Sequence, residues 1–444
     1  MTTKPQPQVL ILGGGFAGPL LAIVLKGRGI TSEVYELRDE GAQQGGNIAL
    51  APNALRVLDI AGVYDKIRRT GFNYEQLYLL NHHGAELGQF RNGSQKDYNY
   101  PAVRIHRREV RNFLLERLKD LDIPIHYKVK FTHVVSETDQ NVTVAFDDGS
   151  ERTADFVVGC DGIHSKVRHY CWPESVPIWQ GAMGMMGTVF ADQLEDRLGP
   201  VGQQDLKKWP SHLPSMLFGD AGMFGTMPAD FAGTEFGFFT TQKTQARSRE
   251  EWGELEKDKA QLKSLMESAF LVEKGGADYP QEVRMLVERA KPETLSVWPF
   301  YVVPETPRWF SEKGRVIFLG DSAHAIPPTG GQGAAQAFED AVTLGLTLKR
   351  IYEPNPMPDV HTGATQSSAI EMLTRWCNHR KERVKKVHDF TSRNGELMKS
   401  SPMWVQQAAK EWVIWASMKA SGPRSGMEWL YQYHCENVLA ALAG

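Results

Sequence analysis

Residues 9–18 read Val-Leu-Ile-Leu-Gly-Gly-Gly-Phe-Ala-Gly, and this stretch decides how the first part of the chain folds. The four apolar residues predict a buried strand, and the GxGxxG pattern behind them predicts a tight turn that opens a helix. Gly13 permits the turn, Gly15 lets a phosphate group approach the backbone, and Gly18 lets the helix sit close to the strand. The N–H groups at the start of such a helix attract anions.

A second strand over residues 32–36 follows this helix and ends at Glu36. A carboxylate at this place accepts hydrogen bonds from the two hydroxyl groups of a ribose. The pattern therefore predicts a bound dinucleotide, with a purely structural glycine turn as the alternative. The residues predicted to line this site are Gly13, Gly15, Phe16, Ala17, Gly18, Glu36, Leu37 and Arg38.

Two later stretches also run from a strand into a glycine-containing turn. Residues 156–168 end a strand at Gly159-Cys160-Asp161-Gly162, which on its own is equally typical of an Asp-capped turn before a helix. Residues 316–334 end a strand at Gly320-Asp321 and pass through a Gly- and Pro-rich loop into a helix that we expect over about 333–352. The backbone N–H groups of that loop form a second place for anions and polar rings.

Together, the GxGxxG turn with its acid, Asp161-Gly162 and Gly320-Asp321 resemble the motifs of the group A flavoprotein hydroxylases, the family of para-hydroxybenzoate and salicylate hydroxylases. His106-Arg107, before a predicted helix, is similar to the arginine-bearing segment of that family. The resemblance implies an α/β fold. We expect a Rossmann-like FAD-binding domain, a mostly antiparallel sheet as substrate domain, and a helical C-terminal region.

The domains are expected to be discontinuous in sequence. The FAD-binding domain would combine residues 1–75, 102–177 and 298–352, and the substrate domain would combine 76–101 and 178–297. A Pro-rich break then separates a helical region at 353–444, whose apolar faces we expect to pack on the rest of the chain.

The resemblance also implies roles around FAD. Glu36 would bind the adenosine ribose, and Arg107 and Asp321 would hold the pyrophosphate and ribityl region. Asp161 would serve both FAD and NAD(P)H. The loop at Gly46, Asn47 and Ile48 resembles the one over which the flavin ring swings. Backbone N–H groups of Gly331, Gly333 and Ala334 would lie beside the N1–C2=O edge of the ring. Gly320 and Pro328 of the same loop are also expected to bind the cofactor.

In this family NADPH or NADH reduces FAD, which reacts with O2 to a C4a-hydroperoxide that hydroxylates or epoxidises an electron-rich carbon. The chain is therefore expected to be an FAD-dependent monooxygenase acting on a small molecule. A flavin oxidase, dehydrogenase or halogenase on the same scaffold is the alternative, although the Trp-x-Trp-x-Ile stretch of halogenases is absent. A flavin-binding protein without turnover is a further alternative.

The substrate prediction rests on Met186. Relatives often carry an arginine there that holds anionic or phenolic substrates, whereas this run reads Trp-Gln-Gly-Ala-Met-Gly-Met-Met-Gly over 179–187. Met186, Phe218 and Phe238 predict a roomy apolar pocket for a bulky, largely neutral aromatic or alkene-bearing compound. The stretch Trp298-Pro299-Phe300 is loosely similar to fungal FAD monooxygenases, which favours a role in secondary metabolite biosynthesis.

Composition narrows the remaining choices. A net charge of −3 indicates no general attraction to nucleic acid or anionic membranes. The polar start and the absence of a long apolar run predict no membrane span and a cytoplasmic location. The four cysteines show no metal-ligand spacing, so no metal site is predicted and we expect them to be small buried apolar residues. Monomer and homodimer both remain open.

Two further features carry weaker predictions. His324 follows Asp321, and we expect it to shape the turn, with a general base as the alternative. The segment 375–386 is rich in Lys and Arg. We expect it to be a solvated helix face, with a phosphate- or membrane-binding patch as the alternative.

Overall fold

The computed structural model describes residues 8–42, 45–203, 205–209, 212–219, 221–326, 330–353, 369–398, 404–421 and 426–443. A parallel sheet forms the centre of its first part, and all of its strand pairs run in the same direction. In spatial order its strands are β18 (Val316–Phe318), β12 (Phe156–Gly159), β1 (Gln8–Leu12), β2 (Thr31–Tyr35) and β8 (Ile125–His126). Residues 9–12 are buried, as expected for a strand covered on both faces.

Helices from distant parts of the chain cover this sheet. The helix α1 (Ala17–Lys26) packs against α12 (Gly333–Tyr352) and α5 (Arg107–Asp120). Three short helices lie nearby: α2 (Pro52–Ile60), α3 (Tyr64–Thr70) and α6 (Lys166–Cys171). One small sheet pairs β3 (Asn47–Leu50), β7 (Ala102–His106) and β4 (Phe72–Tyr74), and another pairs β9 (Phe131–Glu137), β10 (Val142–Phe146) and β11 (Glu151–Ala154).

A seven-stranded sheet forms the second part of the fold. Its order is β17 (Ser296–Val302), β13 (Ile178–Phe190), β16 (Glu235–Lys243), β15 (Gly222–Pro228), β14 (Ser215–Gly219), β5 (Gln76–Asn81) and β6 (Glu86–Arg91). Every pair is antiparallel except β14 with β5. The boundary expected at residue 298 falls inside β17, because this strand pairs with β13 through Val302. On one face of the seven-stranded sheet, apolar side chains form a second hydrophobic core, called the outer core below. Three helices pack into this core: α8 (Arg249–Lys257), α9 (Lys259–Phe270) and α10 (Gln281–Arg289).

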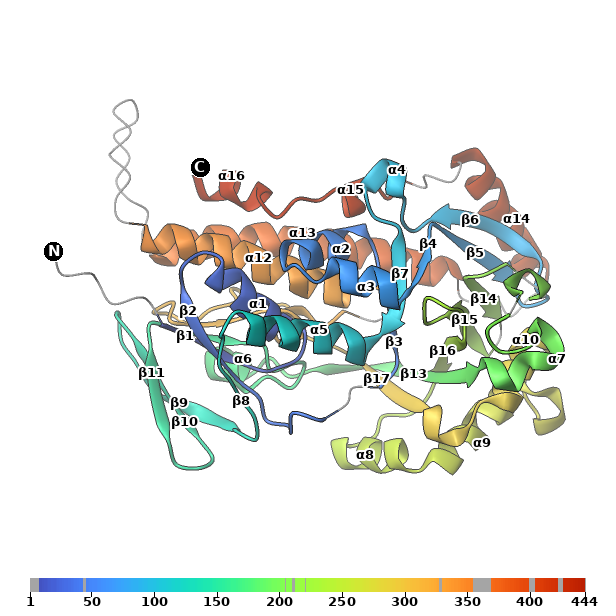
Figure 1. Cartoon of the computed structure of the whole chain (residues 1–444), viewed down its shortest axis with the longest axis horizontal. Coiled ribbons are helices and arrows are strands. Elements are labelled where there is room, and N and C mark those ends of the chain that lie inside the picture. The colour runs from blue at the N-terminus through green and yellow to red at the C-terminus, as the bar shows by residue number, and fades with distance from the viewer. Residues whose placement is uncertain are drawn as a thin grey trace.

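The C-terminal helices pack on both parts. The long helix α13 (Ala369–Met398) lies along α12, and α14 (Trp404–Ser421) lies against β6 (Figure 1). Two short helices, α15 (Glu428–Tyr431) and α16 (Asn437–Ala443), follow them. None of the helices in the described residues is both long enough and apolar enough to cross a membrane. The arrangement confirms the predicted α/β fold with its antiparallel second sheet and helical C-terminal region.

The prediction for residues 375–386 was wrong at two positions. Arg380 is 0% exposed and Arg383 is 8% exposed, and both form ion pairs with an acidic residue of α12. Lys385 and Lys386 are exposed, as predicted. The cysteines follow expectation more closely. All four are free, with Cys377 and Cys435 buried and the other two half-buried.

Candidate functional site

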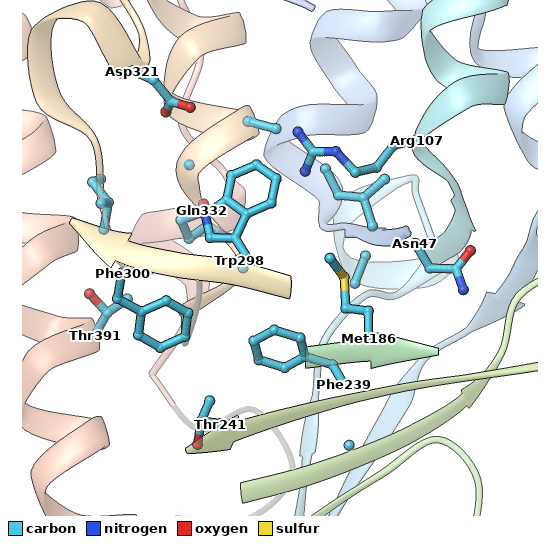
Figure 2. A pocket seen from close by; sticks show the side chains of 18 of the residues that line it. Asn47, Arg107, Met186, Phe239, Thr241, Trp298, Phe300, Asp321, Gln332 and Thr391 are labelled. Carbon is cyan, nitrogen blue, oxygen red and sulfur yellow. The ribbon is translucent and has the colours of Figure 1, made fainter. Parts of the chain in front are cut away.

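A cavity of about 2090 Å³ lies between the parallel sheet and the seven-stranded sheet. Ligand pockets in proteins usually hold about 300–1,000 Å³, so this space accommodates a dinucleotide and a second molecule together. Figure 2 shows Arg107 and Asp321 on one side and Met186, Phe239 and Thr241 on the other, with Trp298 between them. Residues of α14 and α15 complete the wall, among them Ile414, Met418 and Tyr431.

In the glycine turn between β1 and α1, two glycines have no room for a side chain, whereas a third faces open space. Gly13 has φ +120°, and a Cβ there would lie 2.2 Å from the carbonyl oxygen of Cys160. A Cβ on Gly18 would lie 2.0 Å from the carbonyl oxygen of Gly13. A Cβ on Gly15 would meet no atom within 4 Å, and Gly15 lines the cavity. A side chain at Gly13 or Gly18 would therefore clash with the backbone, which is why glycine is needed at both positions. The backbone at Gly15 is open to a ligand.

Glu36 lies directly after β2 and fixes the turn. Its Oε2 accepts a hydrogen bond from the Gly14 N–H at 2.6 Å, and its Oε1 accepts one from the Arg38 N–H at 2.8 Å. Arg111 holds the same turn from the other side, since its Nε donates to the Gly14 carbonyl at 2.9 Å. The sequence analysis missed Arg111. It stands four residues after Arg107 on α5, so helical spacing alone places the two side chains on one face.

Arg107 is a half-buried cation at the edge of the cavity, with its Nε atom buried. Its guanidinium carbon lies 5.0 Å from the centre of the Phe16 ring and 5.1 Å from that of Trp298. Burial lowers the pKa of Arg107, and the negative charge of Asp321 partly offsets this effect. The Arg107 Nε has no hydrogen-bond partner in the described part of the chain. A positive group is therefore presented beside the N-terminus of α1.

The two Asp-Gly and Gly-Asp motifs form one hydrogen-bonded unit. Asp161 Oδ2 accepts from the Lys166 N–H at 2.8 Å, in the first turn of α6. The Ser322 hydroxyl donates to Asp161 Oδ1 at 3.1 Å and accepts from the Gly162 N–H at 3.0 Å. Arg168 adds a bond from its Nη1 to the Ser322 carbonyl at 2.7 Å. Asp161 thus acts as a helix cap, and its contact with FAD or NAD(P)H stays a prediction.

The N-terminus of α12 also borders the cavity. Gly331, Gly333 and Ala334 line it, and the side chain at the N-cap, Gln332, makes no capping hydrogen bond. Asn47 and Ile48 line it from β3, and Leu37 and Arg38 line it beyond β2. Three residues predicted to bind FAD lie outside the lining, namely Gly18, Gly46 and Gly320. Gly46 and Gly320 have φ angles of +83° and +62°, which favour glycine, and Gly18 lies against the Gly13 carbonyl. Pro328 lies outside the described residues.

A buried ion cluster lies behind this helix start and consists of His324, Glu339, Asp340, Arg380 and Arg383. His324 Nε2 lies 2.5 Å from Asp340 Oδ2, and Arg380 Nε donates to Asp340 Oδ1 at 2.7 Å. Burial alone raises the pKa of Asp340, but the charges of His324 and Arg380 outweigh it and lower the pKa to about 2. His324 does not line the cavity. Its expected role in shaping the turn fits this position better than a general base does.

The seven-stranded sheet supplies the substrate side of the cavity. Met186 and Phe218 line it, as expected. Phe238 does not, because side chains alternate along β16. Phe238 is 0% exposed and stacks on Phe224 in the outer core, with the ring centres 5.3 Å apart, whereas Phe239 lines the cavity. The choice of Phe238 was therefore wrong by one residue.

These residues fit FAD. The open backbone at Gly15, the helix start of α1 and the guanidinium of Arg107 suit a pyrophosphate, and the Glu36 carboxylate suits a ribose. The uncapped start of α12 suits the electron-rich edge of a flavin ring.

Comparison with known proteins decides the family. Residues 6–275 and 290–366 match the model of the FAD binding domain family. The chain belongs to this family. It is 26% identical to 6-methylsalicylate 1-monooxygenase of Aspergillus terreus, over 97% of this chain and 90% of the relative. It is 27% identical to 6-hydroxynicotinate 3-monooxygenase of Bordetella bronchiseptica, over 87% of this chain and 92% of the relative.

Solved structures share the fold. A crystal structure of Klebsiella pneumoniae HpxO complexed with FAD and uric acid superposes with a TM-score of 0.72 at 21% identity, covering 99% of this chain and 98% of that one. The matched domain and the named relatives show that the chain is an FAD-dependent monooxygenase, and the predicted resemblance to aromatic hydroxylases is confirmed.

Proposed function

We propose that this enzyme uses NADH or NADPH and O2 to oxygenate a bulky aromatic small molecule in secondary metabolism. The observation that carries the proposal is the large continuous cavity, which joins the residues assigned to FAD to a chamber on the seven-stranded sheet. The two relatives named above act, by their names, on 6-methylsalicylate and 6-hydroxynicotinate, both aromatic compounds. Hydroxylation of a ring is therefore our first choice, and epoxidation of an alkene is the alternative.

In this proposal FAD supplies the oxygen chemistry when it is bound and reduced. The chain's own residues orient and protect it. Arg107 and the start of α1 hold negative phosphate oxygens, and the start of α12 stabilises negative charge on the flavin ring. Met186, Phe239 and Phe300 line the substrate side and exclude water from the reacting carbon.

The size of the substrate follows from the chamber. Four methionines and two phenylalanines of β13 to β16 line its wall, and such side chains bind extended apolar bodies: Met186, Met216, Met223, Met227, Phe218 and Phe239. Met186 brings no charge to this wall. We therefore propose a substrate larger than a single benzoate ring.

The experiment measures oxidation of NADPH and NADH by the FAD-loaded enzyme against a panel of one-ring and multi-ring hydroxyaromatic compounds. A multi-ring compound is expected to accelerate NAD(P)H oxidation, and labelled O2 should place one oxygen atom in the product. Steady NAD(P)H oxidation with hydrogen peroxide as the only product, whatever compound is added, would identify an oxidase and contradict the proposal.

A further inference from the structure

One part of the cavity is polar although its surroundings are apolar. Tyr74, Asn92, Arg104 and Tyr431 all line the cavity. They are surrounded by side chains without charge, namely Leu77, Leu79, Phe90, Met216 and Met227. Ligand pockets use such isolated polar groups to recognise and orient one end of a molecule.

Arg104, on β7, is a buried cation that the described chain does not neutralise. It is 6% exposed, and none of the acidic residues in the described ranges forms an ion pair with it. Its Nε has no hydrogen-bond partner, and its Nη1 contacts the sulfur of Met227 at 3.7 Å. Burial lowers the pKa of Arg104 to about 10, so the side chain stays charged at neutral pH.

A charge in this position is costly unless something pairs with it. Buried arginines that serve the fold are paired in this same molecule, as Arg380 and Arg383 are with Glu339 and Asp340. Arg104 differs because its partner must come from the cavity that it lines.

Tyr74 adds a second donor beside this charge. The Tyr431 hydroxyl donates to Asn92 Oδ1 at 2.7 Å, and Asn92 Nδ2 donates to the Tyr74 oxygen at 2.8 Å. This direction leaves the Tyr74 O–H proton available for a ligand. Burial raises the pKa of Tyr74 to about 12, although Asn92 and the charge of Arg104 oppose this, so the proton is kept.

We propose that Arg104 and Tyr74 bind an acidic oxygen group of the substrate, a carboxylate or an ionised phenol. A guanidinium and a neutral hydroxyl together match the two oxygens of such a group. The reaction on that substrate rests on the proposed function, whereas the binding does not. The proposal replaces the expectation of a neutral substrate, which considered only Met186 on β13. The positive charge enters from β7 instead.

The test compares acids with their uncharged esters in the FAD-loaded enzyme without NAD(P)H. The probes are 3-hydroxy-2-naphthoic acid and 3-hydroxybenzoic acid, each with its methyl ester, and binding is measured from the change in flavin absorbance. The wild-type enzyme should bind at least one acid more tightly than its ester. Arg104→Met should weaken binding of that acid about ten- to hundred-fold and leave the ester unchanged.

Two further variants separate charge from shape. Arg104→Lys keeps the charge and should lose less affinity for the acid than Arg104→Met. Tyr74→Phe removes only the hydroxyl and should weaken acid binding several-fold. The matched control is Arg108→Met, since Arg108 is exposed, pairs with Glu109 and lies outside the cavity. Melting temperature and FAD content are measured for every variant.

The outcomes distinguish this proposal from the proposed function. Equal binding of acid and ester in both pairs, no binding of either acid, or an equal loss of acid and ester in a folded Arg104→Met, would overturn it. If the acid binds through Arg104 but no compound stimulates NAD(P)H oxidation, the binding proposal stands and the proposed function fails. If the esters are hydroxylated as well as the acids, the function stands and this proposal fails.

Discussion

Arg380 and Arg104 are both arginines inside the protein, yet their surroundings differ. Arg380 contacts two carboxylates, since Nη1 lies 2.8 Å from Glu339 and Nε lies 2.7 Å from Asp340. Arg104 contacts no carboxylate in the described part of the chain. The difference teaches where the protein satisfies its own buried groups and where it leaves that to a ligand.

The paired arginines Arg380 and Arg383 support the segments that form the FAD site. Asp340 also accepts a hydrogen bond from the Gly320 N–H at 3.0 Å, so the ion cluster ties α13 to the Gly-Asp motif. Arg383 reaches across to the carbonyl of Leu430 at 2.9 Å. One cluster therefore joins the loop before α12, the helix α13 and the C-terminal segment.

The largest effect is expected when this cluster is broken. Arg380→Met leaves Glu339 and Asp340 buried with part of their pairing lost. We expect the free energy of unfolding to fall by about 3–5 kcal/mol, because an uncompensated buried charge is strongly destabilising. Denaturant unfolding followed by circular dichroism measures it.

Lys385→Met on the same helix is the control, since Lys385 is exposed and pairs with the exposed Asp389. Its effect should stay within about 0.5 kcal/mol. If both variants were equally stable, the cluster would not be the support that its geometry indicates.

A smaller effect on folding, but a strong effect on the cofactor, is expected at the open glycine. A Cβ on Gly15 would meet no protein atom within 4 Å, so Gly15→Val should fold, while its side chain should occupy the place of the pyrophosphate. The purified protein should be nearly colourless, with FAD content reduced at least about tenfold. Absorbance at the flavin band gives the FAD content. Gly253→Val, on an open face of α8, should remain yellow. A yellow Gly15→Val would show that the turn does not carry the pyrophosphate.

The smallest effect on stability is expected at the unpaired arginine. Arg104→Met removes a buried charge that the chain does not neutralise, and the methionine chain fills much of the same volume. The free energy of unfolding should stay unchanged or rise by about 1 kcal/mol, since apolar replacements of buried charges are often neutral or stabilising. The same denaturant series measures it. A loss comparable to that of Arg380→Met would mean that Arg104 supports the fold.

Local patterns allowed much of the fold and the FAD site to be predicted. Gly13, Gly15 and Gly18 follow one strand within ten residues, so their spacing alone indicated the turn, although the backbone that Gly13 must avoid belongs to the distant Cys160. The strand register was harder to predict. Phe238 and Phe239 are chemically equal, and only the pairing of Phe239 with Met186 on β13 decides which one faces the cavity.

The basic segment 375–386 was predicted wrongly in part, also because the partners of its residues lie far away in sequence. Arg380 and Arg383 were taken as solvated because the segment is basic, although helical spacing places them with Trp376 and Val387, which are buried. Their partners lie on a different helix some forty residues earlier, which composition does not reveal. Arg104 was missed because the strand carrying it, β7, was not recognised before the helix α5.

The two sides of the cavity are encoded in different parts of the chain, so they are synthesised at different times. Every residue assigned to FAD precedes α13, whereas Ile414, Met418 and Tyr431 close the chamber from α14 and α15. A chain leaving the ribosome therefore presents the sequence of its cofactor site first, and N-terminal parts generally fold first. The last stretch of the chain to be synthesised therefore completes the wall on the substrate side of the cavity, after all the residues assigned to FAD.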